Sequence, residues 1–506
     1  MPESRTQNSI KNILSSVGVK LNTLILSFAS RTVFIYVLGA EYLGLNGLFT
    51  NILSFLALSD LGLGIAIAYL LYSPLATNNV ERIKIIMKFY KKCYLIIGGV
   101  ILLLGCAIMP FLKYLVNLEQ PIPENLYLVF FLFVLNSAIS YFFVAYKQTL
   151  IEADQKKYLT TKIEIVFTLL NCTADIIVLL IFRNYIVYLV ARCLLVVVRN
   201  LVLSRFIDKR YPFLLEPVEQ SLSKDEVKQL FKDIASVSVF RLGSVLFNSV
   251  TNIVISAVVG TIVVGYYSNY TMLVTQIETF YVITVGAIGA SIGNAVAVET
   301  KERQYDIYKR LDKILTAVLI VCSVCLIQLL NSFVNLWLGN IGKEYVLSQS
   351  VVVLIVANLY TNCSCQLLDR FRTANGLFTI GRDLQVIGGC VNIWLSVLLA
   401  KTWGFEGVLI APFLCKIFIT VTPFVTKVGH AVFDKSYGAM LCEYFSKILL
   451  IAAFSIVIWF ICRSFHLGTI RDFVIESFIT VSIIVVGMSL LYYRTLTFKK
   501  IINQIH

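Results

Sequence analysis

Long apolar runs alternate with short polar connections along almost the whole chain. A membrane-spanning helix needs about 20 mostly apolar residues, and each run reaches or approaches that length. The pattern therefore predicts an all-α polytopic membrane protein with about fourteen transmembrane helices. The predicted spans are residues 13–38, 43–72, 90–115, 125–148, 159–182, 185–205, 233–259, 265–297, 311–338, 346–369, 380–400, 406–427, 443–463 and 473–493.

The first predicted span carries a stripe of polar side chains. Lys20 and Arg31 are eleven residues apart, which places them within about 20° of each other around an ideal helix. Thr23, Ser27 and Ser30 lie on the same side. A charge deep in a membrane costs roughly 2.5–3.5 kcal/mol on insertion scales, so such charges normally face a cavity or a partner. The stripe favours a positively charged cavity; the alternative is that both cations snorkel to the nearer interface.

The stripe recurs 221 residues later. The positions equivalent to Lys20, Thr23, Ser27, Ser30 and Arg31 are Arg241, Ser244, Asn248, Thr251 and Asn252. The same offset relates Gly39 to Gly260, Gly44 to Gly265 and Asn171 to Asn392. A single offset over so long a stretch predicts an internal duplication. For the four glycines we expect tight turns and close helix packing.

The duplication predicts two lobes. Each repeat holds six spans, an even number, so both repeats begin on the same side of the membrane and are parallel. We expect an N-lobe at residues 1–205, a cytoplasmic linker at 206–232 and a C-lobe at 233–427. Residues 428–506 would add two further helices and a cytoplasmic tail. In the linker, Ser223 and Glu226 have the spacing of a capping box, which predicts the start of an amphipathic helix.

Composition supports a membrane location. The chain has 506 residues, of which 58% are hydrophobic and 14% charged, and this excludes an ordinary soluble protein. The net charge of +14 could suggest nucleic acid. However, 31 of the 43 Lys and Arg residues fall in alternate connections, starting with the N-terminus, and only six fall in the others. This is the positive-inside pattern, so we expect both termini in the cytoplasm and no nucleic-acid partner. Because residues 1–9 are polar, we expect no cleavable signal peptide.

Six cations lie inside predicted spans and are candidates for a basic, substrate-binding cavity. Arginine matches phosphate with a planar fork, and lysine supplies a mobile point charge. Arg192 and Arg199 are two turns apart on one face of their helix; they either extend the basic surface or approach its cytoplasmic end. The six candidates are Lys20, Arg31, Arg192, Arg199, Arg241 and Lys416.

Three acids also lie inside predicted spans. Asp60, Asp175 and Glu278 could couple transport to a H⁺ or Na⁺ gradient, or each could neutralise a neighbouring arginine. With three His and twelve scattered Cys, we expect no metal site and no cofactor. External connections are short and hold no cluster of catalytic type, so we expect a transporter rather than an enzyme.

One segment carries a family resemblance. Residues 36–49, YVLGAEYLGLNGLF, and 58–66, LSDLGLGIA, resemble the polysaccharide flippases of the multidrug/oligosaccharidyl-lipid/polysaccharide (MOP) exporter superfamily. The resemblance implies two six-helix bundles around a central cavity that opens alternately to each side of a bacterial plasma membrane. It also implies a substrate of sugars on undecaprenyl pyrophosphate, delivered to machinery that assembles capsule, O-antigen or exopolysaccharide.

The sequence leaves two alternatives to such a flippase. The first is a cation-coupled multidrug exporter of the same superfamily, which would favour a net acidic cavity. The second is a membrane glycosyl polymerase or ligase, which would favour a large external loop with paired acids or an Arg/His cluster. Six intramembrane cations argue against the first, and the short external connections argue against the second.

Overall fold

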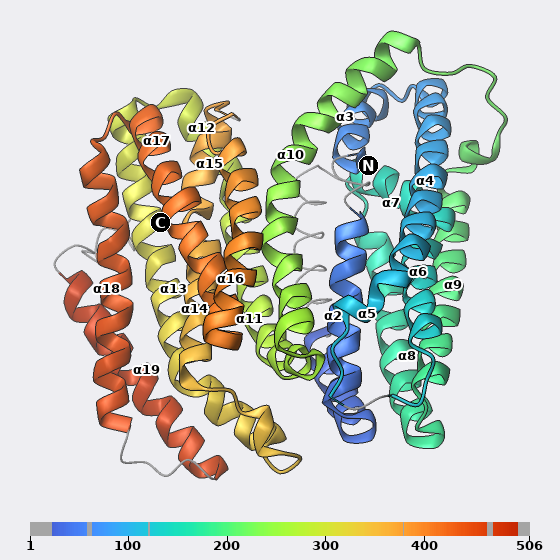
Figure 1. The fold of residues 1–506 in the computed structure, drawn as a ribbon. Helices are drawn as coiled ribbons and strands as arrows, with labels where there is room; N and C mark the ends of the chain where they lie inside the picture. Colours follow the sequence, from blue (N-terminus) through green and yellow to red (C-terminus); the bar gives the residue numbers. More distant parts are fainter. Residues whose placement is uncertain (1–22, 58–62, 120–121, 378, 463–468, 494–506) are drawn as a thin grey trace. The chain divides into compact units, whose positions relative to one another are not determined.

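A computed structural model describes residues 23–57, 63–119, 122–377, 379–462 and 469–493 (Figure 1). Over these residues the chain is helical, which confirms the all-α prediction. It divides into two compact units, Met1–Gly265 (unit 1) and Tyr266–His506 (unit 2).

Unit 1 begins with the helix Thr23–Leu38, which carries no label in Figure 1. Short 3₁₀ turns lie at Met109–Phe111 and Pro212–Leu215, and a π-helix at Ile255–Val259 ends the last helix of the unit. The labelled helices are α2 (Ala40–Leu56), α3 (Leu63–Ala76), α4 (Val80–Ile108), α5 (Leu112–Leu115), α6 (Leu126–Phe143), α7 (Ala145–Ala153), α8 (Tyr158–Phe182), α9 (Tyr185–Arg210) and α10 (Lys224–Val254).

Unit 2 takes in most of α11, which begins in unit 1, and all of the later helices. A 3₁₀ turn lies at Lys343–Tyr345, and a π-helix, η6, at Lys416–Val421. The helices are α11 (Thr261–Ala287), α12 (Gly289–Val298), α13 (Lys301–Leu338), α14 (Gln349–Ser364), α15 (Gln366–Ala374), α16 (Arg382–Cys415), α17 (Thr422–Phe433), α18 (Tyr437–Cys462) and α19 (Ile470–Tyr493).

The described residues contain nine helical stretches long and apolar enough to cross a membrane, or ten if a bent pair is one span. The chain is thus a multi-pass membrane protein, but the expected count of fourteen is not confirmed. Three shorter apolar helices, Thr23–Leu38, Ala66–Ala76 and Val245–Val259, overlap three further expected spans. The stretch Arg382–Phe433 takes in the spans expected at 380–400 and 406–427, and its backbone leaves the helical conformation between them, at Gly404 with φ 58°.

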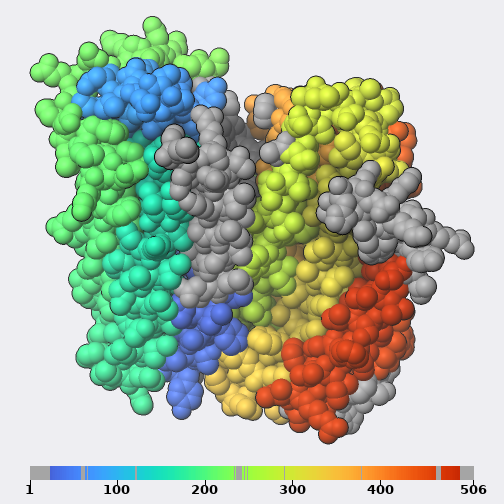
Figure 2. Space-filling model, turned by 180° about the vertical axis from the view of Figure 1, so that it is seen from behind, coloured from blue at the N-terminus to red at the C-terminus, as the bar shows by residue number. Residues whose placement is uncertain are grey.

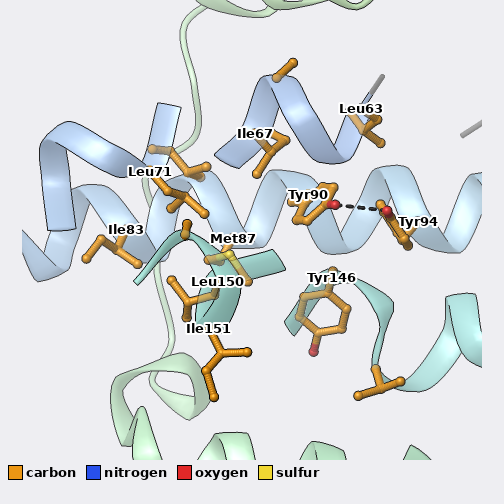
Figure 3. Packing of buried hydrophobic residues seen from close by; sticks show 14 of the residues in the cluster. Leu63, Ile67, Leu71, Ile83, Met87, Tyr90, Tyr94, Tyr146, Leu150 and Ile151 are labelled. Atoms are coloured by element: carbon orange, nitrogen blue, oxygen red, sulfur yellow. Dashed lines mark hydrogen bonds between the residues drawn. The ribbon is translucent and has the colours of Figure 1, made fainter. Parts of the chain in front are cut away.

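A hydrophobic cluster holds α3, α4 and α7 together (Figure 3). Ile67 of α3, Met87 of α4 and Leu150 of α7 are almost completely buried in it. At its edge the Tyr90 hydroxyl donates to the Tyr94 hydroxyl at 2.9 Å, and it also pairs with Thr149 at 2.8 Å. Since lipid is as apolar as these side chains, close packing and hydrogen bonds hold helices together within a membrane.

The linker is bound to the start of α4. The predicted capping box is confirmed: the Glu226 backbone N–H donates to Ser223 Oγ at 3.2 Å, and the Ser223 N–H donates to Glu226 Oε2 at 2.9 Å. Arg82 forms an ion pair with Glu226, and Lys84 forms one with Glu216 at 2.7 Å. The hydrogen bond from the Ser223 N–H lowers the pKa of the Glu226 carboxyl most, and the hydrogen bond from Arg82 lowers it further. From this cap α10 runs unbroken to Val254, so the amphipathic linker helix and the seventh predicted span are one helix.

Tyr211 ties the other end of the linker to the loop before α8. Its hydroxyl donates to Asp154 Oδ2 at 2.5 Å. Burial raises the pKa of Tyr211, and the hydrogen bond to the Asp154 carboxylate adds to that effect. The hydroxyl therefore stays a neutral donor at neutral pH.

Two of the duplicated glycines stand at tight turns. Gly39 has φ 88° and Gly260 has φ 151°, a range that L side chains rarely adopt. Gly39 precedes α2, and Gly260 precedes α11. The equivalent positions of the two repeats thus have the same requirement for glycine, as the sequence predicts.

The other two glycines lie at a reciprocal backbone contact within unit 1. A Cβ on Gly44 would lie 2.0 Å from the Thr261 carbonyl oxygen, and one on Gly265 would lie 2.2 Å from the Ala40 carbonyl oxygen. Thr261 and Ala40 are themselves related by the offset of 221. The predicted close packing is confirmed, and its reciprocal form supports the internal duplication.

Candidate functional site: charged side chains within the membrane helices

A short hairpin places two charged residues of unit 1 opposite each other. Between α8 and α9 only two residues intervene: Arg183, with φ 47°, ends α8, and Asn184 caps α9 by accepting the Val187 N–H at 3.0 Å. Asp175 lies eight residues before Arg183, and Arg192 lies eight residues after Asn184. Antiparallel helices joined so tightly bring these two positions to the same depth.

Asp175 and Arg192 form a bidentate ion pair. Arg192 Nε donates to Asp175 Oδ1 at 3.0 Å, and Nη2 donates to Oδ2 at 2.7 Å. Ser30, on the first described helix, donates a third hydrogen bond to Oδ2 at 2.8 Å. The Asp175 side chain is only 4% exposed, whereas that of Arg192 is 39% exposed. The carboxylate is therefore an internal anchor that orients a more accessible guanidinium.

Tyr188 interacts with both arginines of this cluster. The Arg192 guanidinium carbon lies 4.7 Å from the centroid of the Tyr188 ring, a cation–π arrangement. Arg31 interacts electrostatically with the same tyrosine and is partly buried. We call Ser30, Arg31, Asp175, Tyr188 and Arg192 the arginine cluster. The structure thus brings together four of the residues named from the sequence, Ser30, Arg31, Asp175 and Arg192, with Asp175 in the neutralising role.

Arg199 differs from Arg192 although both lie on α9. Arg199 is partly buried and forms no hydrogen bond or ion pair with any residue in the described parts of the chain. Lys20 and Asp60 lie outside the described residues. Arg241 lies on α10, but its side chain is outside the description. In the second polar stripe, which starts at Arg241, Thr251 is buried. The Asn252 Oδ1 is also buried and accepts no hydrogen bond from a described residue.

Lys416 is the centre of a second charged group, in unit 2. Its Nζ donates to Asn362 Oδ1 of α14 at 2.7 Å, and it interacts electrostatically with Glu278 of α11 and with Cys363. We call Lys416, Asn362 and Glu278 the lysine group. The structure therefore brings together one cation and one acid that the sequence names separately.

The backbone at Lys416 is unusual. Pro412, one turn earlier in α16, has no backbone N–H to donate, and the chain continues from Lys416 as the π-helix η6. π-Helical turns are rare and frequently lie at functional sites. The proline and the wider turn position the lysine against α11 and α14.

Two residues that contact the candidate cations, and one buried acid elsewhere in unit 2, are not evident from the sequence. Tyr188 and Asn362 contact the candidate cations but belong to common residue types in apolar helices. Glu476 lies near the start of the last predicted span, where an acid reads as an end residue, yet it is 3% exposed. A search for polar side chains that share a helix face could have found Glu476, because Thr480 lies one turn further along the same face of α19.

The sequence matches no family model and no curated protein. Solved structures of similar fold include the lipid II flippase MurJ in an inward-closed conformation, at TM-score 0.72 and 13% identity, covering 96% of this chain and 100% of that one. An inward-facing multidrug-resistance MATE transporter of the MOP superfamily matches at TM-score 0.61 and 13% identity, covering 87% of this chain and 98% of that one. A MOP transporter from Pyrococcus furiosus, described as having a binding pocket of reversed polarity, matches at TM-score 0.50 and 13% identity, with 83% and 96% coverage. The chain thus has the MOP-superfamily fold.

Proposed function

We propose that this protein is a flippase for undecaprenyl-pyrophosphate-linked oligosaccharides. It moves the head group from the cytoplasmic to the outer face of a bacterial plasma membrane by alternating access and supplies capsule, O-antigen or exopolysaccharide assembly. The likeness in fold to a flippase of a lipid-linked saccharide, together with cations inside the membrane helices, supports this proposal.

The arginine cluster is the observation that carries the proposal. A guanidinium has five N–H donors, and Asp175 accepts from Nε and Nη2 on one edge. The opposite edge can bind a phosphate oxygen while Asp175 holds the group in place. Arg31, which interacts electrostatically with Tyr188, supplies a second positive charge for the same phosphate. Tyr188 offers the aromatic surface on which a sugar ring can stack.

The remaining candidates take supporting roles. Lys416 is a mobile positive charge in unit 2, and Glu278 beside it is a candidate for coupling to H⁺ or Na⁺. Lys20, Arg199 and Arg241 are further candidate contacts for the substrate phosphate, and Asp60 is a further coupling candidate. In this proposal residues 1–205 and 233–427 form the two moving lobes, 206–232 connects them in the cytoplasm, and 428–506 adds two helices.

Transport by the purified protein tests the proposal. Vesicles that contain the full chain and a fluorescent undecaprenyl-pyrophosphate oligosaccharide would be assayed for movement of the head group between leaflets. We expect wild-type protein to accelerate movement and Arg31→Gln/Arg192→Gln to abolish it. Arg205→Gln, on the exposed end of the same helix α9, is the matched control and retains activity. Equal rates in the double variant and the wild type would refute the assignment.

A cation-coupled drug exporter is the second candidate, favoured by the likeness in fold to MATE transporters and by Asp175 and Glu278 inside the helices. Such a protein would bind cationic drugs at its acids. The same vesicles discriminate, because a drug exporter would accumulate a cationic dye and leave the lipid-linked saccharide where it is.

A further inference from the structure

Glu476 and Thr480 belong to a buried polar cluster formed by α13, α18 and α19, three helices of unit 2 that contact one another. Figure 1 shows where these helices lie. Glu476 and Thr480 are one turn apart on α19 and therefore share a face. Gln328 and Ser332 are one turn apart on α13, which packs against α19, and Ser455 lies on α18. All five side chains are buried, Glu476 with 3% and Thr480 with 0% of its surface exposed. We call these residues the α19 polar cluster.

The hydrogen bonds within the cluster are incomplete. Ser332 Oγ donates to Glu476 Oε2 at 3.1 Å, and Gln328 Nε2 donates to the Ser455 carbonyl oxygen at 2.7 Å. Among the described residues the Ser455 hydroxyl is buried without a hydrogen-bond partner, and the buried Thr480 hydroxyl has only the Cys462 thiol, a weak partner, beside it. Buried polar groups are nearly always paired, so two buried hydroxyls without a strong partner, in the cluster that holds a carboxyl, point to a ligand that bonds to oxygen.

Glu476 also has no counter-charge among the residues that the structure describes. Its one hydrogen bond is to Ser332, and no Lys, Arg or His of the described segments forms an ion pair with it. The titratable group that faces it from α18 is the Cys462 thiol; α13 presents Gln328 and Ser332 there. A lone carboxylate inside apolar helices is costly, and a bound cation would remove that cost.

The donor set fits a hard cation with a single charge. Hard cations prefer oxygen ligands, and the cluster offers the Glu476 carboxylate, the Gln328 side-chain oxygen and three hydroxyls. One carboxylate balances one positive charge, whereas divalent ions call for several anionic ligands. We infer that the α19 polar cluster binds a monovalent cation, sodium in preference to potassium, between α13 and α19. The bound ion would fasten the last helix to α13.

Sodium binding by the full chain in detergent tests this inference without any lipid substrate, so the result is independent of the proposed function. Equilibrium binding of radioactive sodium and the thermal midpoint of unfolding would be measured in NaCl, KCl and choline chloride at one ionic strength. We expect saturable sodium binding and a higher midpoint in NaCl than in the other two salts.

Substitutions on α19 test whether sodium binds at the α19 polar cluster. Glu476→Gln should abolish both effects, and Thr480→Val, which keeps the shape of the side chain, should weaken sodium binding about tenfold (about 1.4 kcal/mol). Asp472→Asn, one turn earlier on α19, is the matched control and should bind as the wild type does. Sodium binding that survives Glu476→Gln would overturn the inference. A midpoint that depends on pH but not on the cation would also overturn it, because the ligand would then be a proton.

Discussion

Two buried acids, Asp175 in unit 1 and Glu476 in unit 2, differ in how their negative charge is balanced. Asp175 is 4% exposed and Glu476 is 3% exposed, and each accepts a hydrogen bond from a serine of another helix. Asp175 is neutralised by a bidentate arginine, whereas no cation of the described residues pairs with Glu476.

The difference teaches what each site can bind. In the arginine cluster the acid holds a guanidinium, and we propose that the second edge of that group, together with Arg31, attracts an anion. In the α19 polar cluster no described cation pairs with the acid, and we infer that it attracts a cation instead. In both proposals the charge of the second partner, rather than the burial of the acid, sets the sign of the ligand.

Removal of the arginine should produce the largest effect. Arg192→Gln leaves the Asp175 carboxylate buried without a counter-charge, so we expect the free energy of unfolding to fall by about 3–5 kcal/mol. Denaturant titration in detergent measures it. In the double variant Arg192→Gln/Asp175→Asn stability should recover, because no charge stays buried, while transport stays lost. If the single variant is as stable as the wild type, Arg192 does not neutralise Asp175, and the contrast with Glu476 fails.

Neutralisation of Glu476 should raise the free energy of unfolding instead of lowering it. Glu476→Gln removes a buried carboxylate that has no partner in sodium-free buffer, so we expect the free energy of unfolding to rise by about 1–3 kcal/mol there. In saturating sodium the gain should shrink, because the wild type is then stabilised by the ion. Unfolding curves with and without sodium measure both values. A loss of stability in sodium-free buffer would show that Glu476 already has a neutralising partner.

The two serines should differ less. Ser30→Ala removes a 2.8 Å hydrogen bond to the ionised Asp175 carboxylate, and we expect a loss of about 1.5–3 kcal/mol, the range for bonds to charged groups. Ser332→Ala removes a longer bond, 3.1 Å, and should cost about 1 kcal/mol without sodium. The same unfolding curves compare the two. Equal losses would weaken the distinction between a paired and an unpaired acid.

An exposed acid supplies the smallest effect. The pKa of Glu226 is lowered, so its cap stabilises the fold above the ordinary pKa of glutamate, and this stability is lost as the pH falls through the lowered pKa. Because the side chain is 41% exposed, screening limits the contribution to under about 1 kcal/mol. Glu226→Gln should therefore flatten the acid limb of the stability profile: stability falls by under about 1 kcal/mol at neutral pH and is almost unchanged below the lowered pKa. A profile identical to the wild type would show that the cap does not act through this charge.

Local patterns are predictable from this sequence wherever the cause is local. The capping box at Ser223 and Glu226 is a matter of spacing along one chain segment, and it is present. The turns at Gly39 and Gly260 follow from the repeat and from the conformational freedom of glycine. The break at Gly404, inside the stretch Arg382–Phe433, likewise falls where the sequence separates the apolar runs 380–400 and 406–427.

Pairing between helices is harder to predict. The sequence names Asp175 and Arg192, but only the two-residue hairpin brings them to one depth. Arg199 has the same apolar surroundings in the sequence as Arg192 and yet has no acid opposite it in the described structure. Glu476 becomes notable only when α13 and α18 are seen to cover it. Figure 2 shows the surface of the C-terminal helices in red. Along α19, Val474 and Phe478 are exposed, while Glu476 between them is buried.

Binding of the lipid carrier itself tests the central claim most directly. Native mass spectrometry of the full chain would compare undecaprenyl pyrophosphate with undecaprenol, which has the same tail and no phosphate. We predict that the wild type retains the pyrophosphate and that Arg31→Gln/Arg192→Gln loses this preference, while Arg205→Gln keeps it. Equal retention of the two lipids by the wild type would contradict the claim that the arginine cluster recognises phosphate.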